Sequence, residues 1–464
     1  MRTIVPEQLE ADYLVIGSGA MGMAFTDVLL AESEATVVMV DRHHQPGGHW
    51  NDAYPYVRLH QPSAFYGVNS RPLGSGRIDT VGWNEGLAEL ATSSEVCAYF
   101  DQVMQQDFLA SGRVRYFPMC EVEGESDGVA RFRSLVSNAQ REVRARKRVD
   151  ATYMNVMVPS VRPPRYEVSE GAVCVPLGEL PRRAGDFEHF VVVGAGKTGM
   201  DACLFLLKNG LDPARITWIM PRDSWLLDRA MIQPGTGGLV DSIFAKQMAA
   251  IGESDSVADM FARLDQSDLL LRLDPEVTPT MYRCATVTQS ELAALRTIDD
   301  VVRMGRVHRV EPGRMVLKEG ERAVPERTLF VDCTADGLAE RPSRPVFSGD
   351  TLTLQAVRVC QQVFSAAFIA HVECRFDDEA KKNELCTPVP HPNTDRDFIR
   401  TTLQNAGNQA LWSQDPALLT WLQRSRLDGF SSEADEPPKP EDMARLAAAA
   451  AAIGKMQAYL EEGR

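Results

Sequence analysis

The chain has 464 residues, of which 44% are hydrophobic and 24% are charged. These proportions are typical of globular proteins and exclude extensive disorder, and the length allows about three domain-sized units. The net charge of −15 means that most of the surface repels nucleic acid and anionic lipid, so neither is an expected partner.

Two further features concern the cell compartment. The longest apolar run, residues 446–453, is far shorter than the roughly eighteen residues that span a bilayer, and residues 1–12 do not resemble a secretory signal. We therefore expect a cytoplasmic protein without a membrane partner. The nine cysteines are odd in number and lack CxxC or zinc-like spacing, so we expect reduced, mostly buried thiols and no redox-active disulfide.

The first motif begins where the apolar run 13–16 enters the glycine-rich turn 17–22, GSGAMG. A helical pattern follows to residue 33, and then a β-branched strand, 36–40, that ends in Asp41. This order predicts a dinucleotide-binding unit, in which glycines allow the turn and the approach of a pyrophosphate while the acid binds an adenosine ribose. Because a tightly held cofactor suits this unit, we expect FAD here. The predicted cofactor-binding residues are Gly17, Gly19, Ala20, Gly22, Asp41 and Arg42.

A second unit begins at the apolar run 190–193, continues as GAGKTG at 194–199, and enters a helix over 200–209. Its next strand, 216–220, ends in Pro221-Arg222 instead of an acid. An arginine at this place suits the 2′-phosphate of NADPH, although a solvated surface charge is the alternative. The predicted cofactor-binding residues are Gly194, Gly196, Lys197, Thr198, Gly199 and Arg222. Two nucleotides in one chain indicate hydride transfer between cofactors.

The segment after Asp41-Arg42 carries Gly47-Gly48-His49-Trp50 and then Tyr54-Pro55. This pattern resembles the flavin-containing and Baeyer–Villiger monooxygenases, and residues 149–152 and 331–337 resemble their two strand-end ATG motifs. The resemblance implies FAD, NADPH, O₂ and a small organic substrate that a C4a-(hydro)peroxyflavin oxygenates. It also adds Gly48, His49 and Trp50 to the predicted cofactor-binding residues.

The chain departs from that family in two places. The fingerprint FxGxxxH is missing from residues 158–189, and His60 stands where the Baeyer–Villiger enzymes carry an acid. In those enzymes the acid supports an active-site arginine, and Arg283 falls in the comparable place. We predict catalytic roles for Arg283, His60 and Arg58. The alternatives are an ion-paired surface arginine at 283 and a hydrogen-bonded loop histidine at 60.

The expected architecture is α/β, with two Rossmann-like units. We expect an FAD-binding domain at 1–185 and 331–378, an NAD(P)H-binding domain at 186–330 with a helical insertion at 238–272, and a helical C-terminal extension at 379–464. Within these, helices are expected over 95–109, capped by Ser93 or Ser94, and over 357–373. The Ala-rich helix 443–462 follows a charged, proline-rich linker at 433–442 and suits packing on its own body or a dimer contact, so the chain is a monomer or a homodimer.

Three functions are compatible with these patterns. The leading hypothesis is an FAD-dependent, NADPH-using monooxygenase. An FAD-dependent oxidase or dehydrogenase without oxygen insertion is the alternative, favoured by the missing fingerprint and by His60. A non-catalytic dinucleotide-binding sensor is the third. The sequence does not identify the substrate, because such pockets are assembled from distant loops.

Overall fold

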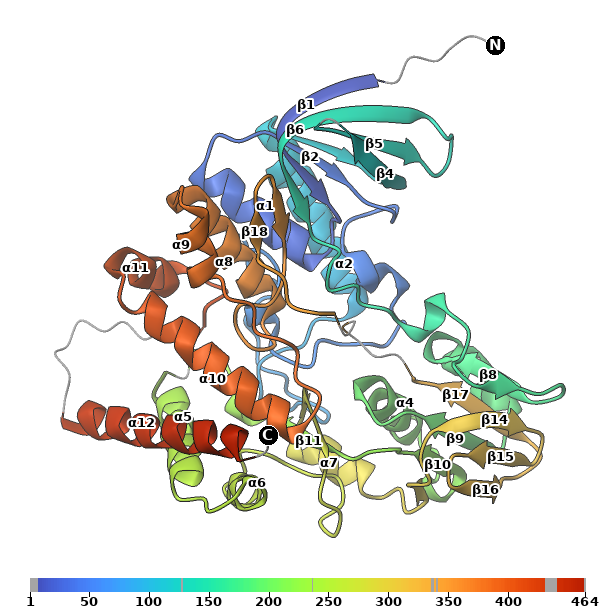
Figure 1. The fold of residues 1–464 in the computed structure, drawn as a ribbon. Helices are drawn as coiled ribbons and strands as arrows, with labels where there is room; N and C mark the ends of the chain where they lie inside the picture. The colour runs from blue at the N-terminus through green and yellow to red at the C-terminus, as the bar shows by residue number, and fades with distance from the viewer. Residues whose placement is uncertain are drawn as a thin grey trace.

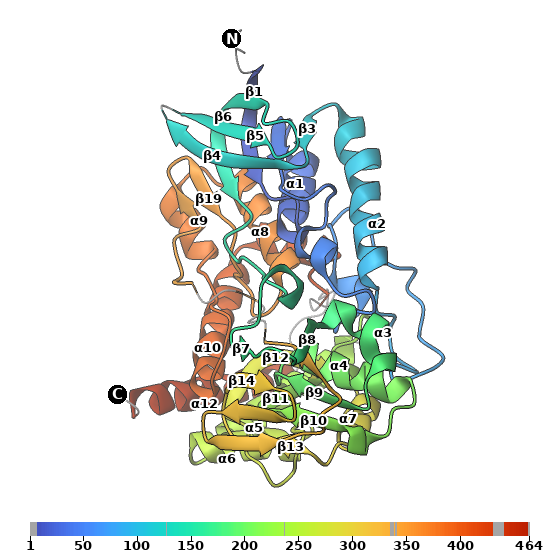
Figure 2. The same ribbon diagram turned by 90° about the vertical axis from the view of Figure 1, so that its right-hand side faces the viewer.

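The computed structural model describes residues 7–126, 128–235, 237–334, 338, 341–429 and 440–462. Two parallel sheets lie at opposite ends of the molecule, with helices packed around them (Figures 1 and 2). The predicted α/β class with two Rossmann-like units is therefore confirmed.

The first sheet has the strand order β18-β19-β6-β1-β2-β3. Strands β19, β6, β1, β2 and β3 pair with one another in parallel, whereas β18 is antiparallel to β19 and β5 is antiparallel to β6. The order β3-β2-β1 is typical of a dinucleotide-binding unit. Its strands are β1 (Glu7–Ile16), β2 (Val37–Val40), β3 (Val114–Phe117), β6 (Gln140–Asp150), β18 (Phe347–Ser348) and β19 (Thr351–Thr353), with β4 (Cys120–Ser126) and β5 (Val129–Ser134) attached to β6.

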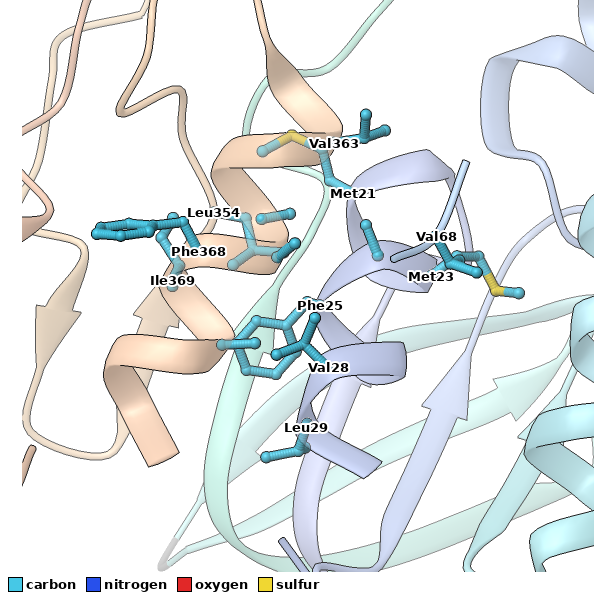
Figure 3. Packing of buried hydrophobic residues seen from close by; sticks show 14 of the residues in the cluster. Met21, Met23, Phe25, Val28, Leu29, Val68, Leu354, Val363, Phe368 and Ile369 are labelled. Atoms are coloured by element: carbon cyan, nitrogen blue, oxygen red, sulfur yellow. The ribbon is translucent and has the colours of Figure 1, made fainter. Parts of the chain in front are cut away.

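Helix α1 (Ala20–Glu32) covers this sheet and packs against α8 (Gln362–Arg375). Figure 3 shows the contact, with Phe25 and Val28 of α1 facing the helix that carries Phe368 and Ile369. Both helices are apolar around most of their circumference, which is typical of helices buried on two sides. This packing fixes the first glycine turn, at the start of α1, against the rest of the first unit.

The second sheet has the order β13-β10-β9-β17-β8 and is parallel throughout. Its strands are β8 (Val173–Pro176), β9 (His189–Val193), β10 (Ile216–Ile219), β13 (Val301–Val302) and β17 (Thr328–Asp332). Helix α4 (Lys197–Lys208) connects β9 to β10.

Strand membership differs from the expected domain limits. Strand β8 precedes residue 186, and β17 reaches residue 332, yet both pair within the second sheet. Val331 pairs with Val192 on one side and Val175 on the other, so β17 is an interior strand of this sheet. All five of its residues are buried, which is typical of a parallel strand covered on both faces. The chain returns to the first sheet only at β18. Residues 335–337 of the expected second ATG motif lie outside the described residues.

The remaining elements surround the second sheet. Strands β11 (Ser224–Asp228) and β12 (Met281–Val287) pair in parallel, and the meander β14 (Val307–Glu311), β15 (Arg314–Leu317) and β16 (Gly320–Ala323) is joined by β7 (Glu167–Val168). The helices between them are α3 (Leu180–Arg183), α5 (Gly237–Gly252), α6 (Val257–Gln266) and α7 (Gln289–Leu295).

The C-terminal part is helical, with α9 (Glu379–Leu385), α10 (Asp395–Trp412), α11 (Pro416–Arg424) and α12 (Pro440–Glu461). Of the two arrangements left open by the sequence, the structure shows α12 against its own chain, packed on α5 and α10. Met456 shares a buried core with Met248 and Phe261, and the hydroxyl of Tyr459 donates to the carbonyl of Ser254 at 2.8 Å. Within the described residues, no helix has the length and apolar character needed to cross a bilayer.

Two helices begin elsewhere than expected. Helix α2 (Ser93–Val103) is capped by Thr92, which forms a capping box with Glu95, and not by Ser93 or Ser94. Helix α8 begins at residue 362, five residues later than predicted, because the preceding chain turns sharply at Cys360, where φ is +55°.

The expectation that all nine cysteines are reduced is wrong for two of them. Cys284, on β12, forms a disulfide with Cys360, just before α8, with the two Cα atoms 6.6 Å apart. The two cysteines are 76 positions apart and form no recognisable sequence motif. They meet because β12 approaches the start of α8 in the folded chain. The other seven cysteines are free thiols.

Candidate active site

The first glycine turn has the geometry that a dinucleotide pyrophosphate requires. Gly17 adopts φ +100°, and a Cβ atom at Gly22 would lie 2.0 Å from the carbonyl oxygen of Gly17. The backbone of Gly48 crosses directly over the same turn, since a Cβ on Gly48 would lie 2.8 Å from the Cα of Gly19. Helix α1 starts without a side-chain cap, so its first N–H groups have no competing side-chain acceptor at Gly19.

Asp41 lies at the end of β2, where a ribose carboxylate is expected. Its Oδ2 accepts from the Ser18 amide at 2.5 Å, and its Oδ1 accepts from the His43 amide at 2.7 Å. The His43 imidazole bridges Asp41 at 3.0 Å and Asp52 at 2.8 Å, and these bonds, led by that to Asp41, raise the pKa of His43 to about 9. Burial alone would raise the pKa of Asp41, but the bonds from His43 and Ser18 hold it below its usual range.

A protonated His43 therefore fixes the predicted ribose carboxylate. The sequence analysis missed this residue, although an imidazole two positions after Asp41 was a usable signal.

The neighbouring predicted residues have different surroundings. Arg42 is 73% exposed and lies 3.6 Å from Glu121, so it points to solvent. His49 is half-buried, and loss of solvent around its imidazole lowers the pKa to about 4. Trp50 is buried and donates from Nε1 to the Tyr66 hydroxyl at 2.8 Å. Ala20 is half-buried at the first position of α1.

The second glycine turn repeats the geometry of the first. Gly194 adopts φ +130°, and a Cβ atom at Gly199 would again lie 2.0 Å from the carbonyl oxygen of the first glycine. Gly196 caps α4 without a side-chain hydrogen bond, and the space beside it is open for at least 4 Å. Thr198 is half-buried. Both turns therefore have the form in which helix amides bind phosphate.

Lys197 joins the second turn to the first unit. Its ammonium pairs with Asp201, one helical turn later on α4, and the other carboxylate oxygen of Asp201 accepts from the hydroxyl of Tyr54. Tyr54 belongs to the Tyr-Pro pair that follows the 47–50 segment, so this part of the first unit is anchored on the second nucleotide helix.

A cavity of about 340 Å³ lies between the two units. On one side it is lined by Tyr153 and Met154, which directly follow the residues beside Gly17. Leu338 also lines it, and this residue comes five positions after Cys333, which lies beside Gly194. The segments 355–356 and 388–393 complete the wall. The cavity thus lies where the chain segments beside both glycine turns converge, which is the usual place for ligands in parallel α/β sheets.

Arg283 lines this cavity, as a catalytic residue should. Its Nε donates to Oδ1 of Asn393 at 2.8 Å, and Nη2 of Arg222 donates to the same oxygen at 3.1 Å. Arg222 is exposed at the end of β10. Two predicted arginines therefore meet at one amide oxygen of the C-terminal extension, and Asn393 is a site residue that the sequence analysis missed.

The three predicted catalytic residues do not all meet. His60 does not line the cavity, and its Nδ1 is buried without a hydrogen-bond partner among the described residues. Burial, together with the charges of Lys197 and Arg229, lowers the pKa of His60 to about 3. Arg58 lies in a separate groove and its guanidinium is half-exposed, 3.8 Å from Asp79.

A second imidazole, that of half-buried His391, lines the cavity, and its Nδ1 is likewise buried without a hydrogen-bond partner among the described residues. Burial and the neighbouring Arg283 lower its pKa to about 4. Arg229, only 1% exposed, holds this region together by donating to the carbonyl of His60 at 3.0 Å and pairing with Glu291 at 3.0 Å. No sequence motif marks His391 or Arg229.

The curated relatives of this chain are mycobacterial. The uncharacterized protein Rv2000 of Mycobacterium tuberculosis is 56% identical over 422 residues, which cover 90% of this chain and 78% of the relative. The uncharacterized protein Mb2023 of Mycobacterium bovis matches to the same extent. The chain belongs to the family of Rv2000. No protein-family model matches it.

This chain is also similar to solved structures of low sequence identity. A steroid monooxygenase, in an oxidised form bound to NADP, has a TM-score of 0.51 and 13% identity, over 79% of this chain and 85% of that one. A flavin-containing monooxygenase from Stenotrophomonas maltophilia has a TM-score of 0.44 and 16% identity, over 79% and 98%. The chain therefore shares its overall fold with the steroid monooxygenase, which agrees with the resemblance noted in the sequence.

Proposed function

We propose that this protein is a monooxygenase that binds FAD at the first glycine turn and NADPH at the second, and uses O₂ to oxygenate a small organic metabolite. The observation that supports the proposal is the duplicated turn: two glycine turns share the same close approach of 2.0 Å, and segments next to the first turn line the cavity that holds Arg283. Bound FAD and NADPH would supply the redox chemistry, which protein side chains alone lack.

The residues of the chain would bind, orient and shield. Asp41, held by His43, suits the adenosine ribose of FAD, and Arg222 suits the 2′-phosphate of NADPH. Arg283 places a fixed positive charge at the cavity wall, where it would stabilise negative charge that develops next to the flavin. His391 and residues 388–390 line the same cavity, where they would limit the access of water.

Glycine-to-alanine variants test the two nucleotide sites separately. An added Cβ at Gly19 would meet only ordinary contacts, and one at Gly196 would meet nothing within 4 Å, so the empty protein tolerates both changes. We expect Gly19→Ala to lose FAD and Gly196→Ala to lose NADP⁺ affinity, because a pyrophosphate needs that space. Gly185→Ala, with equally open surroundings, is the matched control. Full nucleotide binding by both variants would contradict the proposal.

Oxygen reactivity tests the reaction. The FAD-loaded protein is reduced anaerobically with NADPH and mixed with oxygenated buffer in a stopped-flow spectrometer. A transient absorbing species, lengthened by NADP⁺, followed by the spectrum of oxidised flavin, is the expected result. Direct return to oxidised flavin with release of hydrogen peroxide, in the presence as well as the absence of candidate substrates, would contradict a monooxygenase.

The second candidate function is an FAD-dependent dehydrogenase or oxidase, and His60 favours it. His60 stands where the Baeyer–Villiger enzymes carry the acid that supports an active-site arginine, and its lowered pKa keeps the imidazole neutral, so His60 supplies no such negative charge. Mass spectrometry of the product made under ¹⁸O₂ separates the two functions. Incorporation of an ¹⁸O atom excludes the dehydrogenase, and its absence excludes the monooxygenase.

A further inference from the structure

One carboxylate connects the two units of the molecule. Asp201 binds the ammonium of Lys197 through one oxygen and the hydroxyl of Tyr54 through the other. Lys197 belongs to the second glycine turn, whereas Tyr54 follows the 47–50 segment of the first unit. The Asp201 side chain is 12% exposed and that of Lys197 is 26% exposed, so solvent shields this pair less than it shields a surface ion pair.

The Tyr54 segment is docked firmly on helix α4. Lys197, Asp201 and Phe205 are spaced by four residues and so form one stripe along the helix. The ring of Tyr56 stacks on Phe205 at 4.2 Å, and the ring of Tyr54 lies 5.0 Å from that of Tyr56. Tyr54 itself is buried in the core of the second unit. Any change at Asp201 therefore reaches the segment that leads back to residues 47–50.

A dinucleotide at the second turn would compete with Asp201 for Lys197. The lysine is the first residue of α4, where helix amides and the positive end of the helix dipole attract a pyrophosphate. If the ammonium of Lys197 turns to the pyrophosphate, the carboxylate of Asp201 loses that partner but keeps its hydrogen bond from the Tyr54 hydroxyl. Burial and the nearby Asp201 raise the pKa of Tyr54 well above its usual value, so the phenol stays a donor.

We propose that Lys197 is an exchangeable cation: Asp201 binds it in the nucleotide-free protein, the pyrophosphate of the nicotinamide nucleotide takes it, and Tyr54 then holds the carboxylate alone. Nucleotide binding is thereby coupled to the contact between the Tyr54 segment and α4, and through it to residues 47–50 of the first unit. The inference rests on the proposed function, since it requires a dinucleotide at the second turn.

Lys197 also acts on a buried group beside this contact. Its charge is one of those that lower the pKa of His60. Neutralisation of Lys197 by a pyrophosphate would weaken that field, so arrival of the nucleotide changes the surroundings of the unpartnered imidazole as well.

The test is the affinity for NADP⁺, measured by calorimetry on the full chain. Lys197→Met weakens binding by about tenfold or more, because a charge-assisted hydrogen bond to phosphate is lost. Asp201→Asn strengthens binding severalfold, because the lysine no longer has a competing carboxylate. Tyr54→Phe weakens binding by about tenfold, because the carboxylate that Lys197 leaves has lost its donor.

Three controls separate exchange from a structural role. Tyr56→Phe removes a hydroxyl from the same segment, whose bond goes to the carbonyl of Leu177 at 3.4 Å, and leaves NADP⁺ affinity unchanged. In the Asp201→Asn background, Tyr54→Phe no longer has an effect. Adenosine 2′-monophosphate, which lacks the pyrophosphate, binds equally well to every variant. Thermal melts of each variant without nucleotide establish that it is folded.

The sign of the Asp201→Asn effect decides the outcome. A folded Asp201→Asn protein that binds NADP⁺ more weakly than wild type overturns the exchange, because it shows that the carboxylate only orients the turn. Equal effects of Tyr54→Phe and Tyr56→Phe overturn it too. If wild type itself does not bind NADP⁺, the proposed function fails together with this inference, whereas normal wild-type binding with unresponsive variants overturns the inference alone.

Discussion

Removal of the Cys284–Cys360 disulfide should destabilise the protein measurably. The two residues are 76 positions apart, and a cross-link of that span removes about 4 kcal/mol of chain entropy from the unfolded state. It also ties β12 to the segment before α8, so its loss loosens the contact between the two units. We expect Cys360→Ser to lower the free energy of unfolding by about 2 to 4 kcal/mol.

The assay is thermal unfolding with and without dithiothreitol. The reductant should lower the melting temperature of wild type by several degrees and have no effect on Cys360→Ser, which has no bond to reduce. Cys360 is chosen because Cys284 is adjacent to the cavity-lining Arg283. Cys97→Ser, at a half-buried free thiol, is the matched control and should respond to reductant as wild type does.

Two results would refute this reasoning. One is an equal shift by reductant in wild type and Cys360→Ser, which would mean that another group responds. The other is alkylation of both thiols in the untreated native protein, detected by mass spectrometry after blocking under non-reducing conditions.

Two further predictions concern single residues. In steady-state kinetics, Arg222→Gln should raise the KM for NADPH by about ten- to a hundredfold and leave the KM for NADH unchanged, since only NADPH carries the 2′-phosphate. Equal effects on both nucleotides would contradict the proposal that Arg222 binds this phosphate. Burial holds the pKa of His60 at about 3, against 6.5 for a free imidazole, so the unfolded chain binds more protons than the folded chain between these two pH values. The free energy of unfolding therefore falls as the pH drops from 6.5 to 3. Urea titrations should show a flatter pH dependence for His60→Gln, and an unchanged slope would show that His60 is protonated at its usual pKa.

The features that were read correctly from the sequence are local ones. Each glycine turn is encoded within about thirty residues of chain, because the turn needs glycine at fixed positions and the flanking strand and helix have their own periodicity. The end of β2 at Asp41 and the start of α1 at Ala20 follow from the same short-range pattern.

The features that were missed depend on segments far apart in the chain. His391 and Asn393 belong to a loop after α9, and nothing in that loop's sequence shows that it closes the cavity beside Arg283. Arg58 lies only two residues before His60, yet its side chain lines a separate groove, where the chain pairs with Thr92 and the guanidinium lies near Asp79.

The two Rossmann-like units could be predicted from the sequence alone, since adjacent residues specify the strand, the glycine turn and the helix of each. Which side chains meet depends instead on the tertiary structure: Asp201 with Tyr54, Arg222 and Arg283 with Asn393, and Cys284 with Cys360. Such pairs are fixed by how the packed sheets and helices approach one another, and that approach depends on the burial of apolar surface across the whole chain instead of on any local pattern.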